Sequence, residues 1–142
     1  MTITQKFYPS FFQTVLNETL FVENKFSCNI ALFKAGAEFD KEHTLLSDVD
    51  PVALGISSTL KTLEVTLELD LINEKLNFPV PEITWESSPG EDFYHGIIWG
   101  DEGILFMHFD FGGAQNPAGG FKLTPNELCT PHINLSYASG CP

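Results

Sequence analysis

The sequence predicts a mostly β protein, an antiparallel β-sandwich or jelly-roll-like domain with one short N-terminal helix. Two apolar runs, residues 96–99 and 104–112, flank a glycine-bounded acidic turn at residues 100–103, as in a β-hairpin. Residues 62–70 alternate strictly between apolar and polar side chains, which is typical of a half-buried antiparallel strand. Further short apolar runs follow between prolines and glycines, a spacing that favours a sandwich over alternating β and α units.

The chain length predicts one domain, residues 1–142. A chain of this size buries about two thirds of the surface that its unfolded form exposes, so it can fold without metals or disulfides. A hydrophobic content of 43%, with 13 phenylalanines, argues against disorder. No apolar run approaches the ~20 residues that span a bilayer, so we expect a soluble protein that does not enter a membrane.

The first half of the chain contains the predicted helix and one strand. Residues 10–18 have helical spacing of their apolar side chains, and Ser10 is the expected N-cap. Residues 26–34 form an apolar run that predicts the first strand. Residues 38–50 are polar, so we expect a long excursion with at most one helical turn, near residues 42–47.

The second half predicts several strands. In the alternating strand, the side chains expected to be buried are Leu63, Val65, Leu67 and Leu69. A turn at Asn73 and Glu74 leads into shorter strands at residues 75–78 and 83–86, and residues 93–99 form the first arm of the central hairpin. After its second arm, residues 112–120 are expected to be a glycine-rich loop, followed by strands at residues 121–124 and 133–137.

The second arm of the central hairpin has one wholly apolar face. With a period of two, a strand places four apolar side chains on the same side, and we expect these to be buried together: Leu105, Met107, Phe109 and Phe111.

The charge of the chain excludes one large class of partner. Nineteen acidic residues face seven basic ones, all of them lysine, for a net charge of −12. Arginine is the usual bidentate ligand of phosphate and of guanine, so this composition predicts no nucleic-acid binding and no attraction to anionic membranes. The acidic surface either keeps the protein soluble or docks on a basic partner.

Cysteines and histidines show no metal-ligand spacing. The three cysteines, Cys28, Cys129 and Cys141, are an odd number in a chain that begins without a signal-peptide pattern, so we expect no disulfide and a reducing compartment. Among the histidines, His108 shares a strand face with Asp110, but no two histidines form a known motif. We therefore expect structural histidines, no metal and no cofactor.

The acidic and aromatic side chains offer candidate catalytic and sugar-binding groups. Glu86, Glu91, Asp92 and Asp101 could supply the two carboxylates of a glycoside hydrolase. Trp85, Tyr94 and Trp99 could line a sugar site, although core packing is the favoured interpretation. No nucleophile elbow or activated cysteine is present, so we predict no enzyme and no catalytic residue.

The N-terminal segment offers candidate partner contacts. Residues 1–8 have little internal pattern, yet they include Ile3, Phe7 and Tyr8. Apolar side chains on a chain end either anchor on a neighbouring molecule or pack along the edge of their own domain. Residues 1–6 lack the apolar segment of a signal peptide, which favours folding in the cytoplasm.

The order and texture of the strands resemble those of a group of small structural proteins from tailed-phage virions, which are capsid decoration (cement) or tail-associated proteins. The residues that carry the resemblance are 16–20, 29–34, 78–79, 96–99 and 105–112. The resemblance implies a non-enzymatic homo-oligomer, a trimer or dimer, that is assembled in the bacterial host cytoplasm, binds the major capsid protein or other virion proteins, and stabilises the shell. The alternatives are a tail-associated protein, or a carbohydrate-binding module or glycoside hydrolase that uses Trp85, Trp99 and the acidic loops.

Overall fold

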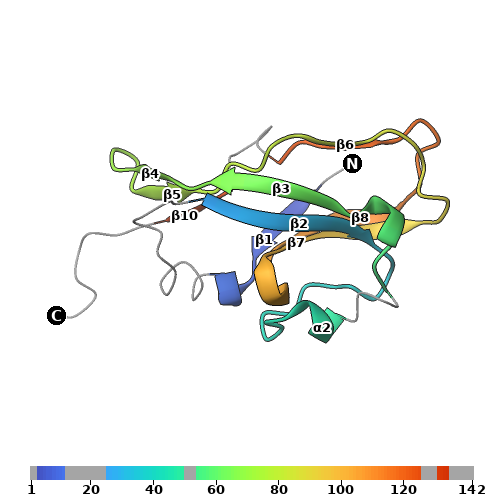
Figure 1. Ribbon diagram of the computed structural model, residues 1–142, viewed down its shortest axis with the longest axis horizontal. Helices are drawn as coiled ribbons and strands as arrows, with labels where there is room; N and C mark the ends of the chain where they lie inside the picture. The colour runs from blue at the N-terminus through green and yellow to red at the C-terminus, as the bar shows by residue number, and fades with distance from the viewer. Residues whose placement is uncertain (1–2, 12–24, 50–53, 126–130, 135–142) are drawn as a thin grey trace.

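The computed structural model describes residues 3–11, 25–49, 54–125 and 131–134, and it is mostly β, as predicted (Figure 1). Its main element is a five-stranded sheet in which every neighbouring pair is antiparallel. In spatial order the strands are β1 (Thr4–Phe7), β8 (Leu105–Gln115), β7 (Phe93–Trp99), β2 (Lys25–Phe33) and β3 (Lys61–Thr66).

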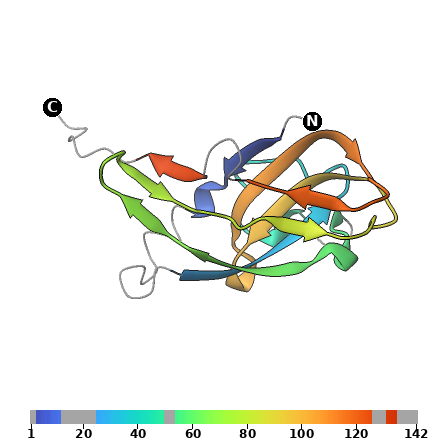
Figure 2. The ribbon, with the colours of Figure 1, turned by 90° about the horizontal axis from the view of Figure 1, so that it is seen from above.

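Two smaller sheets complete a sandwich-like arrangement (Figure 2). One contains β10 (His132–Asn134), β5 (Lys75–Asn77) and β4 (Glu68–Asp70); the other contains β6 (Ile83–Trp85) and β9 (Phe121–Leu123). Side chains of β2, β7 and β8 share one large core cluster with those of β6 and β9. The short helical elements are α2 (Leu46–Val49), η1 (Ser57–Thr59) and η2 (Asp101–Gly103).

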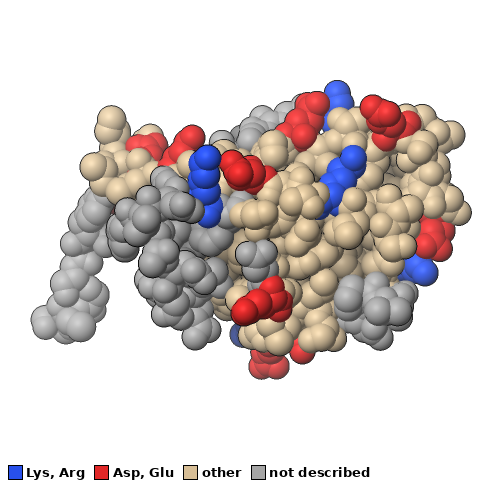
Figure 3. Space-filling model, in the orientation of Figure 1, with Lys and Arg blue, Asp and Glu red and all other residues tan. Residues whose placement is uncertain are grey.

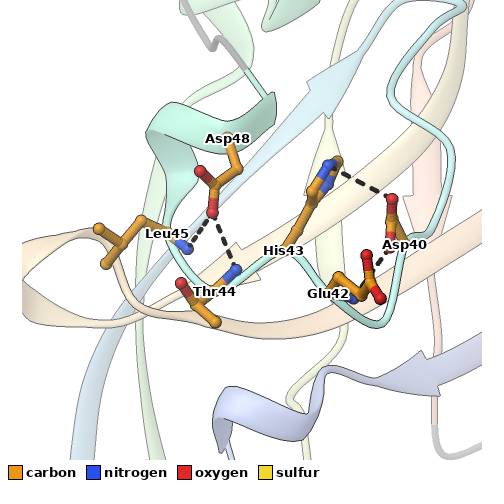
Figure 4. A network of polar contacts seen from close by, with 6 residues as sticks. All are labelled: Asp40, Glu42, His43, Thr44, Leu45 and Asp48. Carbon is orange, nitrogen blue, oxygen red and sulfur yellow. Dashed lines mark hydrogen bonds and ion pairs between the residues drawn. The ribbon is translucent and has the colours of Figure 1, made fainter.

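A second, smaller core lies on the other face of the five-stranded sheet. It contains Phe33 and Ile97 from the sheet together with Ala37 and Val49 from the excursion that follows β2. The excursion includes one helical turn, α2, as predicted, but the turn begins at Leu46 and so lies later than the expected residues 42–47. The Asp48 carboxylate accepts hydrogen bonds from the main-chain N–H groups of Thr44 and Leu45, at 2.9 and 3.0 Å (Figure 4). These bonds lower the pKa of Asp48 and hold the turn in place.

The predicted N-terminal helix is described only at its start. Residues 9–11 are helical, and residues 12–18 lie outside the described residues. Ser10 lies inside the helical residues rather than before them, and its hydroxyl donates a hydrogen bond to the carbonyl of Leu105 at 2.7 Å. The Phe11 ring packs against the rings of Phe78 and Phe106, each with a centroid distance of 4.9 Å.

The central hairpin has the predicted first strand, β7, and the predicted turn, whereas β8 extends beyond its predicted end at residue 112. All four side chains of the expected apolar face are buried, but Leu105 belongs to the smaller core, on the opposite side from Met107 and Phe109. The reason is a bulge: Ile98 pairs with Met107, whereas Trp99 pairs with Leu105, which leaves one additional residue on β8. A bulge reverses the alternation of side chains, so the strict two-residue period was wrong at this point.

The glycine-rich segment was predicted incorrectly in its first part, because β8 continues through it to Gln115. Gly112 and Gly113 have φ values of 78° and 155°, which permit a large irregularity opposite β7. Gly120 ends the segment. A side chain on Gly120 would place its Cβ 2.3 Å from the carbonyl oxygen of Trp85, so only glycine permits this close approach.

Candidate functional site: the apolar tip of the β4–β5 hairpin

Strands β4 and β5 form a hairpin that extends from one end of the molecule (Figures 1 and 2). Residue pairs Leu69 with Leu76 and Asp70 with Lys75 set its register, and residues 71–74 form the turn. β4 follows β3 after a single residue, Leu67, so the hairpin continues the edge strand of the main sheet.

The turn carries large apolar side chains in contact with solvent. Leu69 is 60% exposed, Leu71 64% and Ile72 93%. We call these three residues the apolar tip. Two other large hydrophobic residues are exposed in the described parts of the chain, Leu45 and Leu60, and each stands apart from the tip in the sequence. Single exposed leucines are ordinary, but several together indicate an interaction surface.

The turn holds its shape through one carboxylate. Asp70 accepts hydrogen bonds from the main-chain N–H groups of Ile72 and Asn73, both at 3.1 Å, and from the side-chain amide of Asn73 at 2.8 Å. The bonds from Asn73 are the main reason that the pKa of Asp70 lies below its usual value. Glu74 takes the left-handed conformation, with φ of 55°, that the turn requires.

Acidic residues are the neighbours of the apolar tip in the sequence. Residues 68–75 contain three acidic side chains and one lysine. Glu68 and Glu74 are exposed, while Lys75 lies opposite Asp70 in the register. Figure 3 shows acidic side chains at this end of the molecule. The hairpin therefore combines exposed apolar side chains with two exposed glutamates, Glu68 and Glu74, which we call the rim of the tip.

Sequence reasoning missed this surface. The alternating pattern placed Leu69 on the buried face with Leu63, Val65 and Leu67, but the strand is interrupted at Leu67 and Leu69 is exposed. The available signal was Leu71-Ile72 immediately before the predicted turn at Asn73 and Glu74, where polar residues are usual.

The N-terminal candidates form part of the domain itself. The strand β1, which was not predicted, pairs with β8 from Thr4 to Phe7. Ile3 and Phe7 are half-buried against the larger core, and Tyr8 is fully buried in the smaller one. Burial raises the pKa of the Tyr8 hydroxyl, which has no hydrogen-bond partner among the described residues. Partner contact through Ile3 and Phe7 stays a prediction, whereas Tyr8 is covered by its own chain.

Two histidines lie buried side by side beneath the excursion. The rings of His95 and His108 have centroids 4.9 Å apart, and Nε2 of His108 bonds to the carbonyl oxygen of Ala37 at 2.9 Å. Burial lowers the pKa of His95, and it lowers that of His108 to about 4. Within the described residues, no three His, Cys, Asp or Glu side chains are placed to hold a metal ion.

The two candidate sugar-binding tryptophans do not meet. Trp85 packs against Phe121 in the larger core, and its indole N–H donates to the carbonyl of Thr59 at 2.7 Å. Trp99 lies with Phe33 on the opposite face of the main sheet. An open depression of about 450 Å³ lies beside Trp85 and Glu86.

Two of the acidic candidates, Glu86 and Glu91, lie in the loop between β6 and β7 and have different surroundings. Glu91 pairs with Lys34 at 3.5 Å, and Glu86 lines the depression beside Trp85.

His43 lies in the excursion, where it pairs with Asp40 at 3.6 Å (Figure 4). Cys28 is buried in the larger core, and Cys129 and Cys141 lie outside the described residues.

Comparison with known proteins gives no match to a family model, to a curated protein or to a solved structure. In the part of the chain that the structure describes, no helix is long and apolar enough to cross a membrane.

Proposed function

We propose that this protein is a non-enzymatic structural protein of a phage virion, which decorates the capsid by docking on the major capsid protein and stabilises the shell. The observation that carries the proposal is the apolar tip, whose three large side chains stand in solvent on an ordered hairpin. Such a surface has the properties of a protein-docking site. The resemblance of the sequence to virion proteins supports the shell as the partner.

Co-sedimentation tests this function. Shells assembled from the capsid protein of the same phage, without this protein, are mixed with increasing amounts of it and pelleted. We expect saturable binding and a higher temperature of shell disassembly, because a ligand that binds the assembled state stabilises it. Protein that stays in the supernatant at all ratios would reject the capsid function. Purified tails form a parallel arm, and binding to tails alone would favour the tail-associated alternative.

The oligomeric state is part of the same proposal. Because decoration proteins act at symmetric positions of a shell, we expect a homo-oligomer, a trimer or a dimer. Sedimentation equilibrium of the free protein measures its mass, and a monomer at all concentrations would remove this part of the proposal while leaving shell binding to be judged by co-sedimentation.

A carbohydrate-binding role is the second candidate, and the depression beside Trp85 favours it. Its lining residues include Ser58, Thr84 and Glu86, whose side-chain hydroxyl and carboxylate groups are of the kind that bond to sugar hydroxyls. Titration of tryptophan fluorescence with soluble oligosaccharides tests this role. A saturable change that Glu86→Gln abolishes would support it, and a flat response would reject it.

A further inference from the structure

The apolar tip combines exposed side chains with a negative rim, and this combination defines the partner. We propose that the tip inserts into an apolar pocket on another protein, whose rim carries lysine or arginine side chains. The inference rests on the proposed function and adds the chemistry of the contact surface on the shell. Its components are Leu69, Leu71 and Ile72 as the inserted group and Glu68 and Glu74 as the rim.

The hairpin is prepared for insertion before any partner arrives. The three hydrogen bonds to the Asp70 carboxylate fix the main chain of Ile72 and Asn73. A surface that is already ordered loses less conformational entropy on binding, so more of the gain from burying apolar side chains is retained as affinity. Ile72, which is 93% exposed, has the most surface to bury.

The rim carboxylates require a positive partner. Asp70 is engaged within the turn, and Lys75 lies opposite it in the register, so Glu68 and Glu74 are the carboxylates left to face a partner. Charges at the rim of an interface raise the rate of association when the partner surface is complementary. The whole chain has a net charge of −12, which strengthens attraction to a basic surface at long range.

The same charges disfavour two other binding partners of the apolar tip, a second copy of this chain and an anionic bilayer. A second copy of this chain, meeting tip to tip, would bring four glutamates together around the contact, and like charges oppose such an interface. A bilayer surface that contains anionic lipids would repel Glu68 and Glu74, whereas apolar segments that bind such surfaces are accompanied by lysine or arginine. A protein pocket with a basic rim satisfies both the apolar tip and its charges.

Binding to shells tests the inserted group. The affinity of the unchanged protein for shells is compared with that of Ile72→Asp and Leu71→Asp, with Leu60→Asp as the matched control. Leu60 is 54% exposed and Leu71 64%, so the two leucine variants make the same chemical change at similar exposure. We expect the affinity for shells to fall about 10- to 100-fold for the two tip variants and to change by less than about twofold for the control.

Charge reversal tests the rim. The double variant Glu68→Lys, Glu74→Lys should bind about ten times more weakly at low salt, and added salt should reduce the difference. Glu42→Lys, in the excursion, is the control for a change of charge elsewhere and should have little effect. Circular dichroism spectra and melting temperatures confirm that each variant is folded.

The outcomes distinguish the proposed binding to shells from the proposed role of the tip in that binding. If the unchanged protein does not bind shells, the proposed function fails and this inference falls with it. If it binds and the tip variants bind equally well, the function stands and the inference is wrong. Vesicles of phosphatidylcholine and phosphatidylglycerol form the last arm: binding to them that Ile72→Asp abolishes, with shell binding unaffected, would assign the tip to a membrane instead.

Discussion

The two hairpins β7–β8 and β4–β5 depart from the usual distribution of side chains in opposite directions. The first is the middle of the main sheet and buries two polar rings, His95 and His108, among apolar neighbours. The second stands at one end of the molecule and exposes the three apolar side chains of its tip. Each departure costs free energy in the isolated chain.

The comparison teaches which hairpin stabilises the fold and which is available for binding. Phe109 and Phe111 on β8 contribute to the larger core from the centre of the sheet, so their removal leaves a cavity. The Ile72 side chain is almost fully exposed and contributes little to the core, so its replacement should leave the fold intact. Stability should therefore respond strongly to changes in β7–β8 and weakly to changes at the tip.

The largest effect is expected for Phe109→Ala. Phe109 is fully buried, and deletion of its ring removes apolar contacts and leaves a cavity, so the free energy of unfolding should fall by about 3–5 kcal/mol. Urea titration followed by circular dichroism measures the change. A loss below about 1 kcal/mol would mean that the core relaxes around the cavity, and the central hairpin would then not dominate stability.

Acidification should weaken the same hairpin. His108 is neutral in the fold, with its pKa lowered to about 4, whereas in the unfolded chain it binds a proton near its usual pKa of about 6.5. The contribution of neutral His108 to the free energy of unfolding is therefore complete above pH 6.5. It is lost as the pH falls towards 4, by up to about 3 kcal/mol. Burial lowers the pKa of His95 as well, so the two histidines act in the same direction.

The pH effect is measured by urea titrations at about pH 7 and about pH 4.5. The matched variant is His108→Gln, whose amide can still donate a hydrogen bond to the Ala37 carbonyl but does not titrate. Lys6, Glu38, Asp110 and His95 surround His108 or its neighbour and stay unchanged in this variant. An equal loss of stability in both proteins would assign the acid sensitivity to other groups.

At the β4–β5 hairpin, Asp70→Asn should affect order rather than global stability. An amide in place of the carboxylate weakens the bonds to the main chain of Ile72 and Asn73, so their amide hydrogens should exchange about ten times faster. Hydrogen exchange followed by NMR resolves these two positions. Unchanged exchange would show that residues 71–74 are held in place by other contacts.

The smallest effect is expected for Ile72→Asp. Its side chain is 93% exposed, so the free energy of unfolding should change by less than about 0.5 kcal/mol. Denaturant titration beside Phe109→Ala gives the direct contrast. A loss similar to that of a core residue would mean that the tip is a structural element, and its availability for docking would then be in doubt.

The central sheet could be predicted because its residues carry strong local patterns. The turn at residues 100–103 and the apolar arms on either side predict the β7–β8 hairpin, with β7 at its observed bounds and β8 close to its observed start. The bulge at Phe106 could not be predicted from local patterns. The Phe106 ring occupies space beside Gly100, where a Cβ on residue 100 would lie 2.4 Å from the ring. β1 was missed because its four residues, Thr4–Phe7, gain their pairing from a strand about a hundred positions away.

The candidate site was harder to predict because exposure is a property of the whole fold. Leu69 continues the apolar alternation of β3, and its neighbours in sequence are those of a buried strand. It is exposed because β4 leaves the main sheet after Leu67 and pairs with β5 beyond the edge of the core. Asp70 could be recognised as a turn residue, but the three donors that it binds depend on the geometry of the turn.

The single residue between β3 and β4 has a mechanical consequence. A pull on the apolar tip is shared by β4 and β5, and the part carried by β4 passes through Leu67 to β3, which is paired with β2 at six positions. Force along a strand loads these pairs together, in shear, instead of opening them one after another from the end. A partner that moved while bound to the tip would therefore pull against the paired strands of the main sheet.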